Sequence, residues 1–341
     1  MQMRDALGAL MRRENLNFAE THEVMRQIMT GEISDALIAA FLMGMAMKGE
    51  TAEEISAAAQ VMRELMKPVQ LPPRLEHVVD IVGTGGDGAN LFNVSTAASF
   101  VVAAAGGHVA KHGNRGVSSS SGSADLFAVA GIHLDLDAEQ VARCITEVGV
   151  GFMFAPNHHP AMRYAVGPRR EMGVRTLFNI LGPLTNPAGA ANQVLGVYDP
   201  ALVPQMADVL RRLGSRHVLV VHAEDGLDEI SLAQPTLVAE LRDGEVHEYV
   251  ITPEEMGIAR QSLDTLRVKS AEDSLRLVEQ SLVGEGPAAD IVALNAGAAL
   301  YVSGVADTLK EGAALAQDAQ ASKLPLEKLR ELANFTRVFL Q

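Results

Sequence analysis

The sequence predicts an α/β protein, with a small all-helical N-terminal domain and a larger domain built on a mostly parallel central sheet flanked by helices. Residues 1 to about 67 repeat apolar side chains at helical spacing and show no strand pattern. From Val78 onward, short β-branched runs alternate with segments of helical length, which is typical of parallel strands joined by helices. A length of 341 residues suffices for two domains.

The N-terminal region is expected to consist of helices that end at a proline. Apolar residues recur at helical spacing in residues 17–33 and again in residues 34–50. Thr51 and Glu54 have the spacing of a capping box, which predicts the start of a further amphipathic helix. Pro68 ends that helix, because proline cannot continue the backbone hydrogen-bond pattern.

A proline-rich linker places the domain boundary. Pro72 and Pro73 follow the last N-terminal helix and precede the first predicted strand. The helical domain is therefore expected to span residues 1–70, and the α/β domain residues 75–341. A helical segment near residues 160–190 is expected to join the helical domain.

The strands of the larger domain are predicted from short runs rich in β-branched residues. Residues 237–251 differ from the other runs, because two alternating segments meet at Asp243-Gly244 and so predict an antiparallel hairpin. The remaining runs predict strands separated mostly by helices, at residues 78–82, 108–113, 150–155, 193–198, 217–223 and 289–297.

Composition and charge narrow the class of protein. A net charge of −14 argues against a nucleic-acid-binding protein, which normally needs a basic surface. No apolar run approaches the roughly 18 residues of a membrane helix, and the N-terminus lacks a signal-peptide pattern, so we expect a soluble cytoplasmic protein without a membrane partner. Cys144 is the only cysteine, and its apolar neighbours predict a buried structural thiol.

A glycine turn follows the first predicted strand. Gly83, Gly85 and Gly88 have the G-x-G-x-x-G spacing of dinucleotide-binding proteins. However, Asp87 lies inside the turn, where its bare carboxylate would repel a pyrophosphate unless a metal or ligand hydroxyls intervene. In addition, the next strand ends in Lys111, a cation, where a dinucleotide fold needs an acid for the ribose. The context therefore disfavours a dinucleotide site.

Polar residues after the turn favour a different anion site. Asn93, Ser95 and Thr96 stand at the start of a predicted helix, directly after glycines that expose backbone N–H groups. Both features suit a phosphate. An ordinary strand-to-helix turn, with Asn93 or Ser95 as the N-cap, is the alternative.

A second polar loop follows the next predicted strand. Lys111, His112 and Arg115 supply positive charge, and the serines from Ser118 to Ser123 supply donors among glycines. Consecutive parallel strands end at the same edge of a sheet, so we expect the two loops to lie side by side and to bind a ligand with more than one phosphate. A solvated basic loop is the alternative.

An acidic loop follows the strand predicted at residues 217–223. Asp225, Asp228 and Glu229 offer the hard oxygen ligands that Mg²⁺ prefers. Taken alone, such a run is more commonly a solvated acidic turn. Beside two phosphate-binding loops, it predicts a magnesium site.

The order and spacing of several motifs resemble the anthranilate phosphoribosyltransferase family over essentially the whole chain. The motifs are GTGGD, NVST, KHGNRGVSS, HHPAM, GVRTLFNILGPLTNP and GLDE. The resemblance implies a helical domain beside an α/β domain, with the active site between them. It also implies Mg²⁺, expected as two ions, and a homodimer formed through the helical domain. The implied reaction transfers the phosphoribosyl group of 5-phosphoribosyl-1-pyrophosphate (PRPP) to anthranilate.

The resemblance also assigns roles to individual residues. Anthranilate would be bound by Gly83, Asn114 and Arg169, and the metal by Ser95, Asp228 and Glu229. Contacts to PRPP are implied for a larger set, namely Gly83, Gly86, Asp87, Leu91, Asn93, Val94, Ser95, Thr96, Lys111, His112, Gly113, Asn114, Arg115, Gly116, Val117, Ser118, Ser119 and Ser123.

Two positions depart from the family pattern, and the chemistry needs no assigned base. Leu91 stands where members often carry Thr, which would remove one hydrogen bond, typically about 1 kcal/mol, and Arg163 stands where many carry Lys. The aromatic amine is already a neutral nucleophile, so catalysis by positioning is expected. His112 and His158 are candidates for proton removal, and a structural role is the alternative for His158.

Other functions predict other features. A pyrimidine nucleoside phosphorylase-like enzyme would not need the acidic pair, and a phosphoribosyltransferase for another aromatic amine would share most of the site. A non-catalytic relative that binds nucleic acid conflicts with the net charge of −14. A helical interaction protein would use Met43, Met45 and Met47, which more simply serve the core or a dimer interface.

Overall fold

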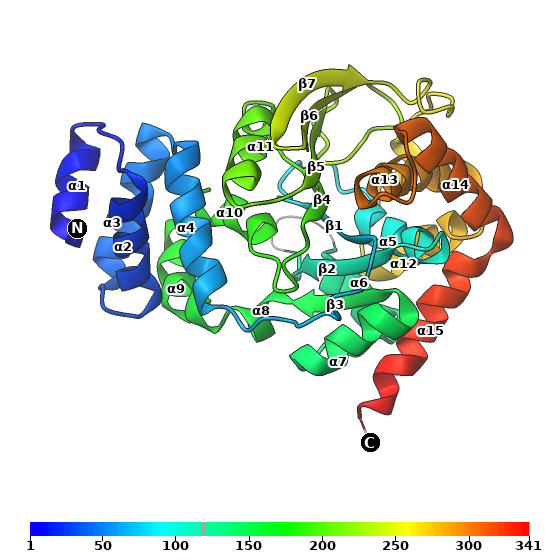
Figure 1. The fold of residues 1–341 in the computed structure, drawn as a ribbon, viewed down its shortest axis with the longest axis horizontal. Helices are drawn as coiled ribbons and strands as arrows, with labels where there is room; N and C mark the ends of the chain where they lie inside the picture. Colours follow the sequence, from blue (N-terminus) through cyan, green and yellow to red (C-terminus); the bar gives the residue numbers. More distant parts are fainter. Residues whose placement is uncertain (117–120, 341) are drawn as a thin grey trace.

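The computed structural model describes residues 1–116 and 121–340, with a group of helices at one end and a helix-covered sheet at the other (Figure 1). In the predicted capping box, the Thr51 side chain accepts from the Glu54 N–H, and the Glu54 carboxylate accepts from the Thr51 N–H, which confirms that prediction. The N-terminal helices are α1 (Met3–Met11), α2 (Phe18–Met29), α3 (Asp35–Lys48) and α4 (Ala52–Leu65).

The sheet has seven strands in the order β3-β2-β1-β4-β5-β6-β7. Strands β1 to β5 run parallel to one another, and β6 and β7 add an antiparallel hairpin next to β5 at one edge. The mostly parallel sheet confirms the predicted fold class. The strands are β1 (Val78–Gly83), β2 (His108–Gly113), β3 (Val150–Phe154), β4 (Asn192–Gly196), β5 (His217–Ala223), β6 (Thr236–Arg242) and β7 (Glu245–Ile251).

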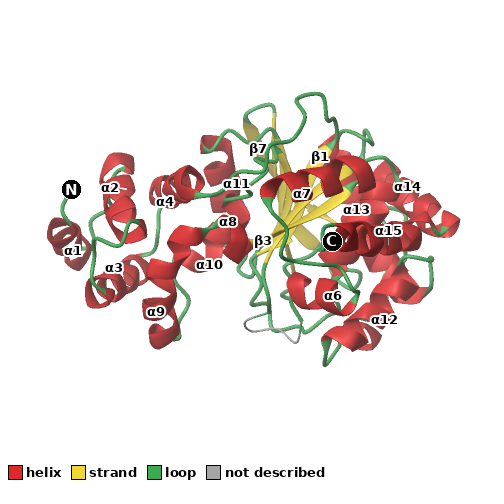
Figure 2. Cartoon of the chain, turned by 90° about the horizontal axis from the view of Figure 1, so that it is seen from below, coloured by secondary structure: helices red, strands yellow, loops and turns green. Residues whose placement is uncertain are grey.

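Helices cover both faces of this sheet. Figure 2 shows α13, α14 and α15 on the side of the strands opposite the N-terminal helices. The helices of the larger region are α5 (Val94–Ala104), α6 (Ser123–Val129), α7 (Ala138–Arg143), α8 (Ala155–His158), α9 (Arg163–Met172), α10 (Phe178–Leu181), α11 (Leu202–Arg212), α12 (Ala271–Ser281), α13 (Gly286–Ser303), α14 (Leu309–Ser322) and α15 (Leu324–Val338). None of the helices in the described ranges is long and apolar enough to cross a bilayer.

Alternate residues along the strands contribute side chains to two hydrophobic cores on opposite faces of the sheet. On β5, Leu219 and Val221 point into the core beneath α5 and α13, whereas Val218 and Val220 point to the opposite face. That second core continues through α11 into the N-terminal helices and also contains Ala165 of α9. Because successive side chains of a strand point to opposite faces, each buried strand packs against the helices on both sides of the sheet. The segment around α9 packs on α2 and α3.

The strand predicted at residues 289–297 is wrong, because this segment lies inside helix α13. The helix is buried nearly all round, so it lacks the one-sided apolar stripe that identifies a surface helix. A continuous apolar run reads equally as a buried strand. Its alanines favour a helix, and Gly297 allows the backbone of α14 to approach at Gly312, where added Cβ atoms would collide.

The hairpin and the cysteine follow the sequence prediction. Asp243 and Gly244 both have positive φ, 54° and 82°, as the tight turn between β6 and β7 requires. Cys144 is fully buried, and burial raises the pKa of its thiol to about 12. This thiol is therefore a packing group rather than a nucleophile.

A partly buried carboxylate fixes the hairpin edge of the sheet to α13. Glu240 accepts hydrogen bonds from Tyr301 (2.7 Å) and Tyr249 (2.8 Å) and lies 2.9 Å from the His217 Nε2. Burial alone would raise the pKa of this carboxyl, but the hydrogen bonds from His217, Tyr301 and Tyr249 outweigh it and lower the pKa to about 2. The lowered pKa stabilises the fold above about pH 4.5, and that stabilisation is lost as pH falls toward 2.

Glu240→Gln is therefore expected to lower the free energy of unfolding by about 2 kcal/mol at pH 7. The difference between the variant and the wild type should shrink as pH falls below about 4.5 and disappear only near pH 2, where the folded wild-type carboxyl becomes protonated as well. Urea unfolding at pH 7 and at about pH 2.5 checks both statements. Glu248→Gln, an exposed change on β7, is the control. An equal loss at both pH values would show that charge is not the cause.

Candidate active site

The glycine turn leaves the sheet at its topological switch point. β1 lies between β2 and β4, so successive connections depart from it in opposite directions, and ligands of parallel α/β sheets bind at such points. Gly85, Gly86 and Gly88 have φ of 67°, 84° and 71°. Residues with a side chain rarely adopt this left-handed backbone conformation, which explains the glycines at these positions. Because glycine has no side chain, the backbone of the turn is exposed.

The acidic loop packs directly against the glycine turn. The Gly85 N–H donates to the Asp228 carboxylate at 2.7 Å. A Cβ at Gly83 would overlap this carboxylate, and a Cβ at Gly196 would overlap the Asp228 main chain. Glycines at both positions therefore keep open the space through which the acidic loop reaches the end of β1.

Three carboxylates gather at this edge of the sheet. Burial and the nearby Asp87 raise the pKa of Asp228 to about 6, and burial and Asp228 raise the pKa of Glu229 to about 8. Like charges held close together favour a compensating cation. Within residues 1–116 and 121–340, no three His, Cys, Asp or Glu side chains converge as a complete metal site. Further oxygen ligands are thus required for a metal here.

Lys111 lies beneath these carboxylates. Its ammonium group is buried and donates to the Ile81 carbonyl at 2.6 Å and to the Ser95 hydroxyl at 3.2 Å. Burial lowers the pKa of Lys111, whereas the charges of Asp80 and Glu229 oppose that shift. The lysine therefore holds Ser95 in place next to the acidic pair from within the protein.

An aspartate binds the described residues on both sides of the second loop. Asp125 accepts from the Gly116 N–H at 2.9 Å and the Gly122 N–H at 3.0 Å, and its other oxygen accepts from the Arg115 side chain at 3.1 Å. A Cβ at Gly122 would collide with the Gly116 nitrogen. Gly116 and Gly122 are thus held in close contact just before α6 begins. Val117, Ser118 and Ser119 lie outside the described residues.

The two polar loops lie side by side, as expected for neighbouring parallel strands. The Asn93 amide donates to the Ser121 carbonyl at 3.1 Å, and the Thr96 hydroxyl donates to the Ser123 hydroxyl at 3.1 Å. Asn93 occupies the N-cap position of α5, but its side chain makes no cap hydrogen bond and instead joins the second loop.

Several predicted PRPP contacts can come only from the main chain. Val94 is buried in the core, and Gly113 has no side chain. Leu91 forms an isolated β-bridge with Arg267, so its backbone is partly engaged within the protein. Asn114 is exposed, and its side chain accepts from the Arg115 N–H at 2.8 Å.

The histidines near the site are buried and neutral. His112 Nδ1 lies 3.2 Å from the Gly182 carbonyl, and its Nε2 lies 3.2 Å from the His159 Nε2. Burial, followed by the effect of His159, lowers the pKa of His112 to about 3. His158 Nδ1 lies 3.0 Å from the Lys67 carbonyl, and burial lowers its pKa. These contacts favour structural roles for both candidates.

Arg169 is a half-buried cation on α9. Its guanidinium lies over the Phe178 ring, 5.3 Å from the centroid, and burial lowers its pKa. Across the described parts of the chain, no carboxylate forms an ion pair with it, and no hydrogen bond links it to Gly83 or Asn114. A desolvated guanidinium in this state suits an incoming carboxylate.

Comparison with known proteins places this site in a family. Two family models match the chain, a glycosyl transferase helical bundle domain at residues 4–66 and a glycosyl transferase α/β domain at residues 75–323. The anthranilate phosphoribosyltransferase of Chromohalobacter salexigens is 77% identical, covering 99% of this chain and 98% of that protein. The chain belongs to the anthranilate phosphoribosyltransferase family.

Solved structures of this family have the same fold. The enzyme from Thermus thermophilus superposes with a TM-score of 0.91 at 46% identity, covering 98% of this chain and 99% of that one. The enzyme from Saccharomyces cerevisiae, in complex with PRPP and Mg, superposes with a TM-score of 0.88 at 25% identity and covers 98% of both chains.

The sequence did not predict several residues that hydrogen-bond to the predicted site residues and hold them in place. Asp80 is buried and accepts from the Asn186 amide at 2.7 Å and from the His112 N–H at 3.3 Å. Asp125 and Arg175 were also missed. Only Asp125 had a local signal, a Gly-x-x-Asp spacing at the start of α6.

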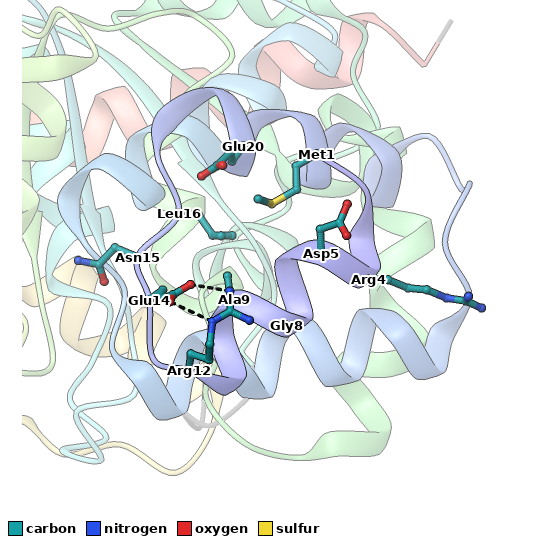
Figure 3. A pocket seen from close by; sticks show the side chains of 10 residues that line it. All are labelled: Met1, Arg4, Asp5, Gly8, Ala9, Arg12, Glu14, Asn15, Leu16 and Glu20. Carbon is teal, nitrogen blue, oxygen red and sulfur yellow. Dashed lines mark hydrogen bonds and ion pairs between the residues drawn. The ribbon is translucent and has the colours of Figure 1, made fainter.

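A pocket of about 470 Å³ lies apart from this site, between α1 and the start of α2 (Figure 3). Arg4, Asp5 and Glu20 contribute to its lining, and an ion pair of 2.7 Å joins Arg12 to Glu14 at its edge. None of the predicted site residues lines it. The family's characteristic motifs therefore do not involve this hollow.

Proposed function

We propose that the protein transfers the 5-phosphoribosyl group from PRPP to the amino group of anthranilate, in tryptophan biosynthesis. The products are N-(5-phosphoribosyl)anthranilate and pyrophosphate. The observation that carries the proposal is the meeting of the glycine turn, the second loop and the acidic pair at the switch point of the sheet. Relatives that share nearly the whole chain bear the name of this activity.

The proposed PRPP contacts are the exposed N–H groups of the glycine turn, the residues from Asn93 to Thr96, and the second loop with Ser123. Backbone donors at the start of α5 suit a phosphate, because the helix N-terminus carries partial positive charge. These groups would hold the leaving pyrophosphate while the bond from it to the ribose C1 breaks. Fixed donors of this kind stabilise the charge that develops on the leaving group.

The residues present fit Mg²⁺, and we propose two ions. Asp228, Glu229 and the Ser95 hydroxyl are hard oxygen donors, and a bound cation would offset the repulsion between neighbouring carboxylates that contributes, after burial, to the raised pKa values of both carboxyls. When bound, Mg²⁺ neutralises charge on the pyrophosphate. Asp228 and Glu229 would position the ion. The hydrogen bond from Lys111 holds the Ser95 hydroxyl, the third proposed ligand.

No general base is assigned. The amino group of anthranilate attacks as a neutral nucleophile at the ribose C1 while pyrophosphate leaves, and the nitrogen then loses a proton to the departing pyrophosphate or to solvent. The enzyme therefore mainly aligns two substrates. We propose that the substrates bind between two domains, each of which contributes contacts. The helical domain comprises residues 1–70 together with the segment 160–190, and the α/β domain comprises residues 75–341. Arg169 of α9 would orient anthranilate through its carboxylate, and Gly83 and Asn114 of the α/β domain are proposed to complete the anthranilate contacts.

Arg169→Ala is expected to raise the KM for anthranilate about 10- to 100-fold, because a charge-assisted hydrogen bond contributes roughly 1.5–3 kcal/mol. The KM for PRPP should change less than about twofold. Steady-state kinetics with each substrate varied in turn checks this. Arg170→Ala, an exposed change one residue further along α9, should behave as wild type. A selective defect for PRPP would contradict the assignment.

A homodimer through the helical domain and a cytoplasmic location complete the proposal. Met11 and Met47 are exposed on α1 and α3, at 87% and 69% of their full accessibility, which is unusual for large apolar side chains. Covering these methionines would give a subunit interface an apolar centre.

One assay tests the function directly. Anthranilate fluorescence is followed while the protein is mixed with PRPP and Mg²⁺, with and without EDTA. A PRPP-dependent loss of fluorescence that EDTA abolishes supports both the reaction and the metal. If fluorescence persists while PRPP still binds, the amine is wrong, and other aromatic amines are then screened.

A further inference from the structure

An arginine outside the proposed contact set reaches the middle of the glycine turn. Arg175 lies on the loop between α9 and α10, and its guanidinium donates to the Gly86 carbonyl at 2.5 Å. The same guanidinium lies over the Tyr198 ring, 4.0 Å from the centroid. A Cβ at Gly86 would lie 2.8 Å from the terminal nitrogen of Arg175, so a side chain there would displace the arginine from the turn. Arg175 and the turn are therefore closely fitted.

Other contacts fix the two ends of the turn from within the α/β region. The Thr84 N–H donates to the Gly196 carbonyl at 2.9 Å, and the Thr84 hydroxyl accepts from the Tyr198 N–H at 3.2 Å. At the far end, the Arg267 side chain donates to the Ala89 carbonyl at 2.6 Å. Arg175 differs from these anchors because its loop continues from α9, which packs on α2 and α3.

We propose that Arg175 is a positioning residue that orients the glycine turn for PRPP. The inference rests on the proposed function. In a trans peptide unit, the carbonyl and the following N–H point in opposite directions. Holding the Gly86 carbonyl on Arg175 therefore directs the Asp87 N–H away from the arginine. It also keeps a carbonyl oxygen from turning toward the phosphate.

The contact requires a guanidinium. A planar guanidinium can lie on an aromatic ring and donate from its edge at the same time. A lysine ammonium is a point charge on a flexible chain and does not hold both contacts in one geometry. The turn has glycines at 85, 86 and 88, all with positive φ, and so depends on outside contacts for its shape.

The test has one measurement on the ligand-free protein and one with PRPP. Hydrogen exchange is measured by mass spectrometry on the peptide that contains residues 84–89 in Arg175→Ala, Arg175→Lys and wild-type protein. Calorimetry with Mg²⁺ then gives the Kd for PRPP. The control is Arg170→Ala, which removes an exposed arginine from α9. Melting temperature reports whether each variant keeps its fold.

Arg175→Ala is expected to speed exchange of this peptide about tenfold and to raise the Kd for PRPP about tenfold, with the KM for anthranilate unchanged. Arg175→Lys should recover only part of each loss. Wild-type exchange in Arg175→Ala would overturn the inference, as would equal losses for both substrates together with a lower melting temperature. If wild-type protein forms no product from anthranilate, the proposed function fails, while the exchange result still decides the role of Arg175.

Discussion

Replacing Asp228 and Glu229 together by Ala is expected to lower kcat/KM at least about 100-fold and to raise the Mg²⁺ concentration needed for half-maximal rate. Metal stabilisation of a developing charge supplies several kcal/mol, and each 1.4 kcal/mol corresponds to a factor of ten. The two carboxylates lie at the glycine turn with raised pKa values, so they are the strongest metal-ligand candidates in this loop. Initial rates measured over a Mg²⁺ titration check the prediction.

Asp225 offers a matched control in the same loop. Its carboxylate accepts from the Ser231 hydroxyl at 2.6 Å and so serves the loop rather than the site. Asp225→Asn should therefore keep the wild-type magnesium dependence. If the double variant also kept that dependence, with normal turnover, the metal assignment would be abandoned.

Much of the fold could be predicted because short sequence patterns specify its local elements. The Thr51–Glu54 capping box and the Asp243-Gly244 turn each depend on a few neighbouring residues, and both occur as expected. Helix α13 could not be read in this way. Its burial on all sides removes the periodic signal, and only its packing partners distinguish it from a buried strand.

The candidate site shows the same division between local and distant causes. The two polar loops follow adjacent parallel strands, so their proximity follows from chain order. Asp80 and Asn186 meet across 106 residues, and Arg175 and Gly86 across 89. The spacing of neighbouring residues in the sequence does not predict such distant contacts. The structure was therefore needed to find the groups that hold the loops in place.

The burial of Lys111 changes what its replacement should do. Sequence reasoning expected a direct contact with PRPP, but the ammonium group lies below the surface, on the Ile81 carbonyl and the Ser95 hydroxyl. Its positive charge compensates Asp80 and Glu229. Removing it leaves those carboxylates unbalanced and releases Ser95, a proposed metal ligand. Loss of one member of a buried charge group costs roughly 3–5 kcal/mol.

Lys111→Met, which keeps the apolar stem, is therefore expected to weaken PRPP binding about 100-fold and to lower the melting temperature. The uncompensated negative charge repels the phosphates, and the loss of the buried ammonium destabilises the end of β2. Calorimetry with Mg²⁺ and a thermal scan measure the two effects, with the exposed Lys310→Met on α14 as the control. A lower melting temperature with unchanged PRPP affinity would restrict Lys111 to a structural role. Unchanged values for both would refute the argument from buried charge.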